Sequence, residues 1–437
     1  MSPVEPESQT ISLQPGAPRQ NAPRKVQRVV SPLGIEAWLV EEYAVPLIAV
    51  EFAFRGGAAH DSAEHAGAAR IFASLLDEGA GPYGSEAFQE QLAERAIELS
   101  FGADRDAWRG SLKTLARNKD RAFELLRLAI TEPRFDDSAV ERVREQVLAG
   151  LRHEANDPDS LAAKALFART FGDHPYGRPI KGTVDTVPGL TRDLIAAIKP
   201  DALTRAGLVV SVVGAIDAAT LAGQLDAVFG ALPASSRLEA IGPASPLATG
   251  GLEIIDVDVP QTSLRFAVPG LLRNDPDFMA AVVFNHILGG GAFTSRLFQE
   301  VREKRGLAYG VSTSLATFRA AGLVVGGTAT KNERAAESLT VIREEIARLT
   351  NDGPSADELA KAQQYLVGSY PLQFDSSSKI ARQLLQIALD DLGLDYIDRR
   401  NGLIEAVTLA DVQRVGERLF GTSKLLVIAA GRPEGLA

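Results

Sequence analysis

The stretch NHILGGGAFTSRLFQEVREKRGLAYGVST, from Asn285 to Thr313, contains residues typical of a helix followed by residues typical of a strand. The charged run from Ser295 to Lys304 predicts a helix, and Gly306 suits the left-handed position that follows a helix end. Tyr309 then opens YGVSTSL, which predicts a strand. Ahead of this helix stand three residues that are typical of a turn between helices: Gly289, Gly290 and Gly291.

Part of this stretch repeats an earlier segment of the chain. AAVVFNHILGGG, which begins at Ala280, resembles AARIFASLLDEG, which begins at Ala68, 212 residues upstream. Three further pairs lie 217 residues apart in the same order: the capping-box sequences SAVE (Ser138–Glu141) and SADE (Ser355–Glu358), the helix N-cap candidates Thr191 and Thr408, and the β-runs LVVSVVG and LLVIAAG that end at Gly214 and Gly431. Four such pairs indicate a duplicated chain.

Each half follows the same plan. The first opens with the strand candidates VQRVV, IEAWLVEE and LIAVEFAF, and the second with GLEIIDVDV and TSLRFAV. Apolar spacing predicts helices at 66–78, 85–99, 111–131 and 138–156, and again at 275–288, 294–304, 332–350 and 356–370. Because strands and helices do not alternate strictly, we expect an α+β fold of two homologous domains, each an antiparallel or mixed β-sheet packed against helices. The expected domains are 26–231 and 252–437, joined by a linker at 232–251 that is rich in Pro, Ala, Ser and Gly.

The composition excludes several classes of protein. The chain has 437 residues, 45% of them hydrophobic and 23% charged, as in ordinary globular proteins. It has no cysteine, which excludes disulfides and thiolate metal sites, and its net charge of −10 argues against nucleic-acid binding. No apolar run reaches the ~20 residues that span a bilayer. Residues 1–25 are typical of a disordered tail without signal-peptide features, so we expect a cytoplasmic protein, or a periplasmic one if the sequence is a mature form.

Three motifs, together with the duplication, resemble the pitrilysin/insulinase-type zinc peptidases. The stretch from Asn285 to Thr313 is similar to a characteristic segment of that family's second domain. HPYGRPIKG (His174–Gly182) is similar to a loop late in its first domain, and FRGGAAHD (Phe54–Asp61) to the strand end that precedes its zinc helix. The resemblance covers residues 26 to 435 and implies that each domain forms half of a metallopeptidase clamshell.

The resemblance also implies that the zinc site is lost. In catalytic members the helix carries H-x-x-E-H, whose histidines bind zinc and whose glutamate activates the metal-bound water. The matching positions here are Arg70, Ala73 and Ser74. An arginine side chain only donates hydrogen bonds, an alanine side chain has no polar group, and a serine hydroxyl is a poor zinc ligand. Ala149 and Gly150 stand where the family has glutamates, including the third ligand. We therefore expect this chain to bind no metal.

The histidines of the neighbouring segment do not replace the lost ligands. His60 and His65 are five residues apart, so on a helix they would point about 140° from each other. We expect both on a surface loop. The whole chain has only five histidines, which leaves few ways to build another metal site.

In this family the second domain supplies an arginine and a tyrosine that reach the substrate. VREKRGLAYG places that pair at Arg302 and Tyr309. A guanidinium and a phenol hydroxyl can both donate to a peptide carbonyl. The alternative is that Arg302 pairs with a neighbouring carboxylate and that Tyr309 merely packs. For Gly289–Gly291, the alternative to an ordinary turn is a glycine-rich loop that helps to hold substrate.

The leading hypothesis is a non-catalytic, substrate-binding subunit of a heterodimeric zinc metallopeptidase. A partner of the same family with an intact H-x-x-E-H motif would hold the zinc, and this chain would bind peptide substrates. The second hypothesis is a structural assembly protein derived from the same family, like the peptidase-related core subunits of respiratory complexes. A third is an active peptidase with a displaced metal site, which the scarcity of ligands disfavours.

Overall fold

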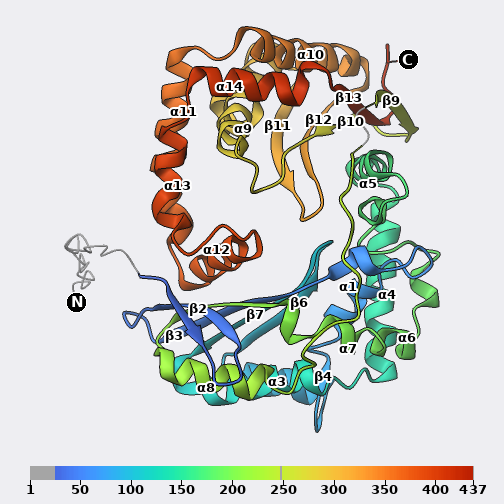
Figure 1. Cartoon of the computed structure of the whole chain (residues 1–437). Coiled ribbons are helices and arrows are strands. Elements are labelled where there is room, and N and C mark those ends of the chain that lie inside the picture. The colour runs from blue at the N-terminus through green and yellow to red at the C-terminus, as the bar shows by residue number, and fades with distance from the viewer. Residues whose placement is uncertain (1–24, 247–248, 437) are drawn as a thin grey trace, which may run out of the picture.

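The computed structural model describes residues 25–246 and 249–436, so nearly all of the expected tail at 1–25 lies outside the described residues. Two halves, each built on one β-sheet, lie one above the other in Figure 1. The N-terminal sheet has six strands in the order β1 (Gln27–Val30), β2 (Glu36–Glu41), β8 (Leu208–Gly214), β3 (Leu47–Arg55), β7 (Ala107–Leu115) and β6 (Glu98–Ala103). A separate two-stranded hairpin joins β4 (Gly79–Ala80) and β5 (Tyr83–Gly84).

The C-terminal sheet repeats this order. Its five strands run β9 (Thr249–Asp256), β13 (Lys424–Gly431), β10 (Gln261–Pro269), β12 (Gly322–Lys331) and β11 (Ala308–Thr317). In both sheets the pair formed by the last strand and an early one is parallel, β2–β8 and β9–β13, and the other pairs are antiparallel. The predicted α+β fold of two homologous domains with mixed sheets is therefore confirmed.

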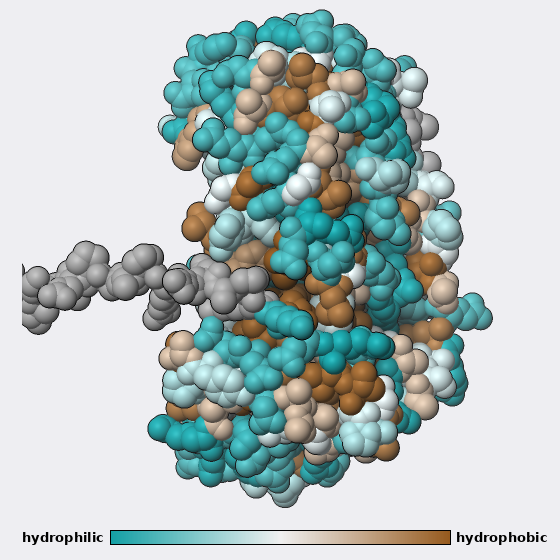
Figure 2. Space-filling view, turned by 60° about the vertical axis from the view of Figure 1, so that its left-hand side comes forward, coloured by the Kyte–Doolittle hydropathy of each residue, from teal (hydrophilic) through white to brown (hydrophobic). Residues whose placement is uncertain are grey.

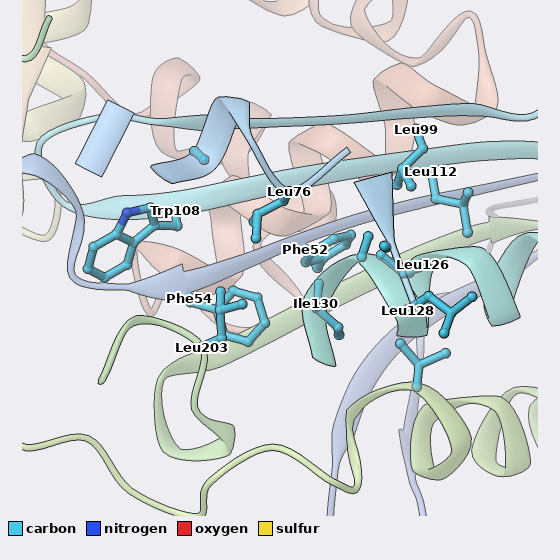
Figure 3. Close-up of a cluster of buried hydrophobic side chains, with 14 of the residues drawn as sticks. Phe52, Phe54, Leu76, Leu99, Trp108, Leu112, Leu126, Leu128, Ile130 and Leu203 are labelled. Carbon is cyan, nitrogen blue, oxygen red and sulfur yellow. The ribbon is translucent and has the colours of Figure 1, made fainter. Parts of the chain in front are cut away.

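Each half also contains helices beside its sheet. In the first half they are α1 (Ala68–Ser74), α2 (Ser85–Ala93), α3 (Lys119–Thr131), α4 (Asp137–Glu154), α6 (Arg192–Ala196), α7 (Lys199–Ala202) and α8 (Ala218–Phe229). In the second half they are α9 (Phe278–Asn285), α10 (Ala335–Asp352), α11 (Ala356–Gly368), α13 (Tyr396–Glu405) and α14 (Leu409–Gly416). The core of the first half lies between its sheet and these helices, where Phe52, Phe54 and Trp108 pack with leucines (Figure 3).

One packing device appears in both halves. Phe52 on β3 pairs with Gly110 on β7, and Phe266 on β10 pairs with Gly326 on β12. A Cβ added to Gly110 would lie 2.1 Å from the ring of Phe52, and one added to Gly326 would lie 2.2 Å from the ring of Phe266. Each ring therefore lies flat over a glycine of the neighbouring strand. This shared cross-strand pair supports the duplication that the sequence indicates.

The two halves exchange helices. α12 (Ser377–Leu389) belongs to the second half but packs on β3 and β8 of the first. Figure 1 shows α12 over the sheet of the first half. α5 (Pro158–Phe171) belongs to the first half and packs on β10 and β13 of the second. The inner face of each sheet is thus covered by the other half. The sequence analysis assigns each domain one continuous stretch of the chain, 26–231 and 252–437, and does not predict that a helix of each would pack on the sheet of the other.

The segment expected as the linker lies against both halves. Residues 233–246 contain neither helix nor strand. The backbone N–H of Ala244 donates to the carbonyl of Ala320 in the second half, and the imidazoles of His60 and His174 lie within hydrogen-bond distance of the carbonyls of Glu239 and Gly242. The segment that connects the two halves is therefore held to both of them by hydrogen bonds.

Two expectations about local structure are wrong. Residues 111–115 were expected to open a helix but belong to β7, where Leu112 and Thr114 are buried in strand alternation. Leu112 and Leu115 are three residues apart, so they also fit a helical period, and only the sheet decides between the two. SAVE forms no capping box because α4 begins at Asp137, after its N-cap Asp136, so that Ser138 lies within the helix. By contrast, Ser355 forms its predicted capping box with Glu358.

Candidate functional site

The helix that corresponds to the zinc helix is α1, between the end of β3 and the first hairpin. Ala73 is fully buried, whereas Arg70 and Ser74 are half-buried. The Arg70 guanidinium lies against the edge strand β6, because its Nη1 is 3.4 Å from the place that a Cβ on Gly102 would occupy. A permanently charged cation at this position repels a metal ion, and neither neighbour supplies a strong ligand.

The N-terminus of α1 is closed by a buried carboxylate. The side chain of Asp61 accepts from the backbone N–H groups of Gly67 and Ala69 at 3.0 Å. Burial raises the pKa of Asp61 to about 7, although these N–H donors and the charge of Arg178 oppose the shift. This aspartate therefore positions the helix and does not form part of a metal site.

The positions where the family has glutamates, on α4, are equally unsuited to zinc. Ala149 and Gly150 are exposed on α4, whose buried residues include Val143 and Leu148. Neither alanine nor glycine has a side-chain donor atom. Among residues 25–246 and 249–436, no three or more His, Cys, Asp or Glu side chains lie close enough together to hold a metal ion. The residues present do not fit the zinc that the family resemblance implies.

The segment that carries Arg302 is wound more loosely than expected. It is helical from Arg296 and π-helical over Phe298–Glu303, which is a rare geometry that is frequent at functional sites. Gly306 has a φ of 58°, and the N–H of Leu307 donates to the carbonyl of Val301, so the predicted left-handed helix end is confirmed. The chain then turns directly into β11.

Tyr309 lies at the start of β11 and is 88% exposed. The pairing of β11 with β12 is irregular between Ala308 and Val311, so Tyr309 and Gly310 form a bulge. Thr330 donates to the carbonyl of Leu307 and Thr328 to that of Gly310, each at 2.7 Å, which holds the backbone on both sides of Tyr309. Within this chain, Tyr309 is therefore not packed in the core.

The side chain of Arg302 contacts two residues of its own helix. Its guanidinium lies 4.8 Å from the centre of the Phe298 ring, and its Nε is 3.8 Å from the carboxylate of Glu303. Both members of the Arg302–Glu303 pair are more than one-third exposed, so the pair contributes little. The carboxylate contact of the alternative interpretation is thus present, but it leaves Arg302 accessible to a ligand.

The three glycines do not form an open turn. Residues His286–Gly290 are π-helical, and a Cβ on Gly289 would lie 2.6 Å from the hydroxyl of Thr313 on β11. Close packing, rather than a positive φ, requires glycine there. The exposed part of the loop is Ala292–Thr294, where Phe293 is 68% exposed and meets Phe298 edge to face at 5.1 Å.

We use the name aromatic–arginine surface for the exposed residues Phe293, Arg302 and Tyr309 together with Phe298, whose buried ring contacts Phe293 and Arg302. The segment Phe298–Glu303 packs against β11, the strand that carries Tyr309. This surface is anchored by Arg296, which makes two hydrogen bonds of 2.6 and 2.8 Å to the carboxylate of Glu358 on α11. This partnership lowers the pKa of Glu358 to about 2. The sequence analysis does not single out Arg296; the signal for it is the second role of the capping glutamate, Glu358.

The fold and the site define a two-domain metallopeptidase scaffold whose metal positions hold no ligands. The family model "Insulinase (Peptidase family M16)" matches residues 43–184, and the model "Peptidase M16 inactive domain" matches residues 189–366. The chain therefore belongs to the peptidase M16 (insulinase) family and contains both its N-terminal and its C-terminal domain.

Relatives within this family have contrasting descriptions. The non-peptidase homolog YmxG of Helicobacter pylori is 26% identical over 340 residues, which cover 77% of this chain and 78% of that protein. An uncharacterized zinc protease of Streptomyces coelicolor is 32% identical over 302 residues, or 67% of this chain and 65% of that one. The crystal structure of a peptidase M16 inactive domain from Pseudomonas fluorescens superposes with a TM-score of 0.88 at 27% identity, covering 94% and 98% of the two chains.

Within the described residues, every helix is too short or too polar to pass through a lipid bilayer.

Proposed function

We propose that this chain is the non-catalytic, substrate-binding subunit of a heterodimeric M16 zinc metallopeptidase. The observation that carries the proposal is the contrast between its two half-sites. Arg70, Ala73 and Ser74 leave the metal positions without strong ligands, whereas Tyr309 is 88% exposed and the Arg302 side chain is 39% exposed. A zinc-bearing subunit of the same family would supply the metal and the hydrolytic chemistry.

The aromatic–arginine surface has the chemistry to bind an extended peptide. Exposed aromatic side chains next to an arginine are typical of the residues that contribute most to binding. The phenol of Tyr309 and the guanidinium of Arg302 can donate to peptide carbonyls, and Phe293 offers an apolar contact for a side chain. The bulge fixed by Thr328 and Thr330 keeps Tyr309 oriented before substrate arrives, which reduces the entropy lost on binding.

Activity of the reconstituted complex tests this proposal. The chain should be co-expressed with an H-x-x-E-H-bearing M16 protein from the same genome, and peptide hydrolysis should require both. In that complex Arg302→Ala and Tyr309→Phe should each lower kcat/KM by about 10²–10³-fold, the cost of removing one donor to a developing oxyanion. Size-exclusion chromatography should show unchanged assembly.

Matched variants control for nonspecific effects. Tyr43→Phe alters another exposed tyrosine, which is 59% exposed and lies in the first half, and Arg343→Gln alters an exposed arginine on α10. Both should leave kcat/KM unchanged. Full activity of Arg302→Ala and Tyr309→Phe complexes would refute the substrate-binding role and favour the structural assembly hypothesis.

Metal analysis separately tests whether the partner, and not this chain, holds the zinc. The purified chain should hold far less than one zinc per molecule, and the complex should hold one, on the partner. A tightly bound stoichiometric zinc in the isolated chain would contradict the proposal directly.

A further inference from the structure

A cavity of about 590 Å³ lies between the two halves, apart from the aromatic–arginine surface. Figure 2 shows the waist between the halves, where apolar atoms are exposed among polar ones. The cavity is lined by the tips of the β6–β7 and β11–β12 hairpins, the end of α12 and the loop after β10. Its arginines outnumber its aspartates by one: Arg55, Arg105, Arg109, Arg273 and Arg319 against Asp104, Asp106, Asp390 and Asp391.

The two hairpin tips are equivalent in the duplicated fold. In the first, the N–H of Asp104 donates to the carbonyl of Ala107 at 2.9 Å, and in the second Phe318 donates to Ala321 at 2.8 Å. The second residue of each four-residue tip is an arginine. These two arginines, Arg105 and Arg319, are therefore counterparts in the duplicated fold.

The first of these arginines, Arg105, is held by aromatic side chains. Its guanidinium lies 4.1 Å from the ring centre of Phe167 on α5, and its Nε donates to the carbonyl of Tyr176 at 3.0 Å. Phe171 packs against the rings of Tyr176 and Phe318 at 5.5 and 6.2 Å. On the α5 side, aromatic rings thus fill the space beside the hairpin tips.

On the opposite side, the equivalent helix brings polar side chains. The N-caps of α5 and α12, Asp157 and Ser376, lie 219 residues apart, and both accept a hydrogen bond from the third helical residue. The same spacing relates the buried pairs Ala162 and Ala381, and Leu166 and Leu385.

This spacing places Gln386 where α5 has Phe167, and Asp390 where it has Phe171. Both polar residues line the cavity. The cavity is therefore the unfilled counterpart of the aromatic cluster.

The second arginine, Arg319, has no side-chain acceptor among the described residues, although its backbone N–H donates to Asp106. The aspartates nearby are already engaged: Asp391 by Arg55 at 3.0 Å, Asp104 by Arg109, and Asp390 by Gln386.

Arg105 uses only one of its five N–H donors within the part of the chain described. Burial lowers the pKa of Arg105 to about 10, as expected for a cation whose charge is incompletely compensated. Two guanidinium groups, one from each half, thus retain free donors.

We propose that this cavity binds an aromatic carboxylate, namely the C-terminal end of a short peptide whose last residue is aromatic. The ring would occupy the space that Phe167 and Phe171 occupy on the other side. The carboxylate would accept two parallel N–H bonds from Arg319, the geometry that guanidinium groups favour. The choice of a peptide as the source rests on the proposed function, because peptide hydrolysis generates new C-terminal carboxylates.

Calorimetric titration of the full chain, without a partner, tests the proposal with N-acetyl-phenylalanine, its C-terminal amide and inorganic phosphate. The free acid should bind, and the amide and phosphate should bind at least about tenfold more weakly, since a charge-assisted bidentate contact and the ring are both required. Equal binding of acid and amide, or of phosphate and acid, would overturn the assignment, as would binding of none of them.

Two variants locate the site. Arg319→Gln should weaken binding of the free acid at least about tenfold without lowering the unfolding temperature, because its side chain has no partner to lose. Gln386→Phe, which rebuilds the α5 arrangement, should block binding by filling the cavity. Arg343→Gln on the exposed face of α10 should bind like the unaltered chain. Unchanged binding by Arg319→Gln would refute the site.

The outcome is separable from that of the proposed function. If the titration fails while the reconstituted complex depends on Arg302 and Tyr309, only the cavity assignment is wrong. If the acid binds through Arg319 but the complex shows no peptidase activity, the proposed function is wrong.

Discussion

Tyr176→Phe should weaken the contact between the two halves without creating a cavity. Tyr176 is fully buried, and its hydroxyl donates to Asp106 on the β6–β7 tip. The same hydroxyl accepts from the N–H of Ala320 on the β11–β12 tip at 3.0 Å. The phenylalanine ring would keep the contacts with Phe171 and Phe318, so the change isolates these two hydrogen bonds.

The expected cost follows from the chemistry of the partners. A hydrogen bond to a charged group contributes about 1.5–3 kcal/mol, and a buried N–H left without an acceptor costs about 1–3 kcal/mol. Partial access of water to Asp106 and Ala320 relieves part of each cost, so we expect a loss of about 3 kcal/mol in the free energy of unfolding. Since unfolding slopes of about 3 kcal/mol per molar urea or more are usual for chains of this size, the urea midpoint should fall by up to about 1 M.

Equilibrium urea unfolding, followed by fluorescence and circular dichroism, measures this loss. Tyr43→Phe is the matched control, because its exposed hydroxyl donates to Glu41 at 2.9 Å within one half. That control should change the free energy of unfolding by less than about 0.5 kcal/mol. A Tyr176→Phe midpoint equal to that of the control would refute the view that this hydroxyl couples the two hairpin tips.

Three further predictions concern local structure. Gly326→Ala should lower the free energy of unfolding by about 3 kcal/mol in urea titrations, because its Cβ would lie 2.2 Å from the Phe266 ring; a loss below about 1 kcal/mol would mean that the ring moves aside easily. Ser355→Ala should cost about 1 kcal/mol by the same measurement and Ser138→Ala almost nothing, since only the first serine caps a helix; equal losses would contradict the observed caps. Asp61 has its pKa raised to about 7 in the folded chain against ~4 when unfolded, so its contribution to stability is present below pH 4 and is lost as the pH rises to 7. The unfolding temperature of Asp61→Asn should therefore increase relative to the unaltered chain across that range, and a constant difference would show that the carboxylate is not the titrating group.

Some features of this protein are already determined by short-range patterns in its sequence. The repeated capping sequences and β-runs indicate two homologous α+β domains, because each pattern reports local backbone preferences that survive duplication. No coordinates are needed to see that Arg70, Ala73 and Ser74 lack strong zinc ligands, since an arginine only donates, an alanine has no polar group and a serine hydroxyl is a poor ligand. Periodicity is weaker evidence where the same apolar residues fit both a helix and a strand, as Leu112 and Leu115 do. There, pairing within the sheet determines that the segment is a strand.

Other features depend on residues that are far apart in the chain, and only the tertiary structure decided them. The exchange of α5 and α12 requires each helix to find the sheet of the other half, which no local pattern encodes. The exposure of Tyr309 depends on a bulge set by pairing with β12. The cavity beside Arg319 is lined by Gln386, which lies on a distant helix of the chain. Local sequence thus determines which elements form and which chemistry is lost, whereas long-range packing determines which side chains remain free to bind.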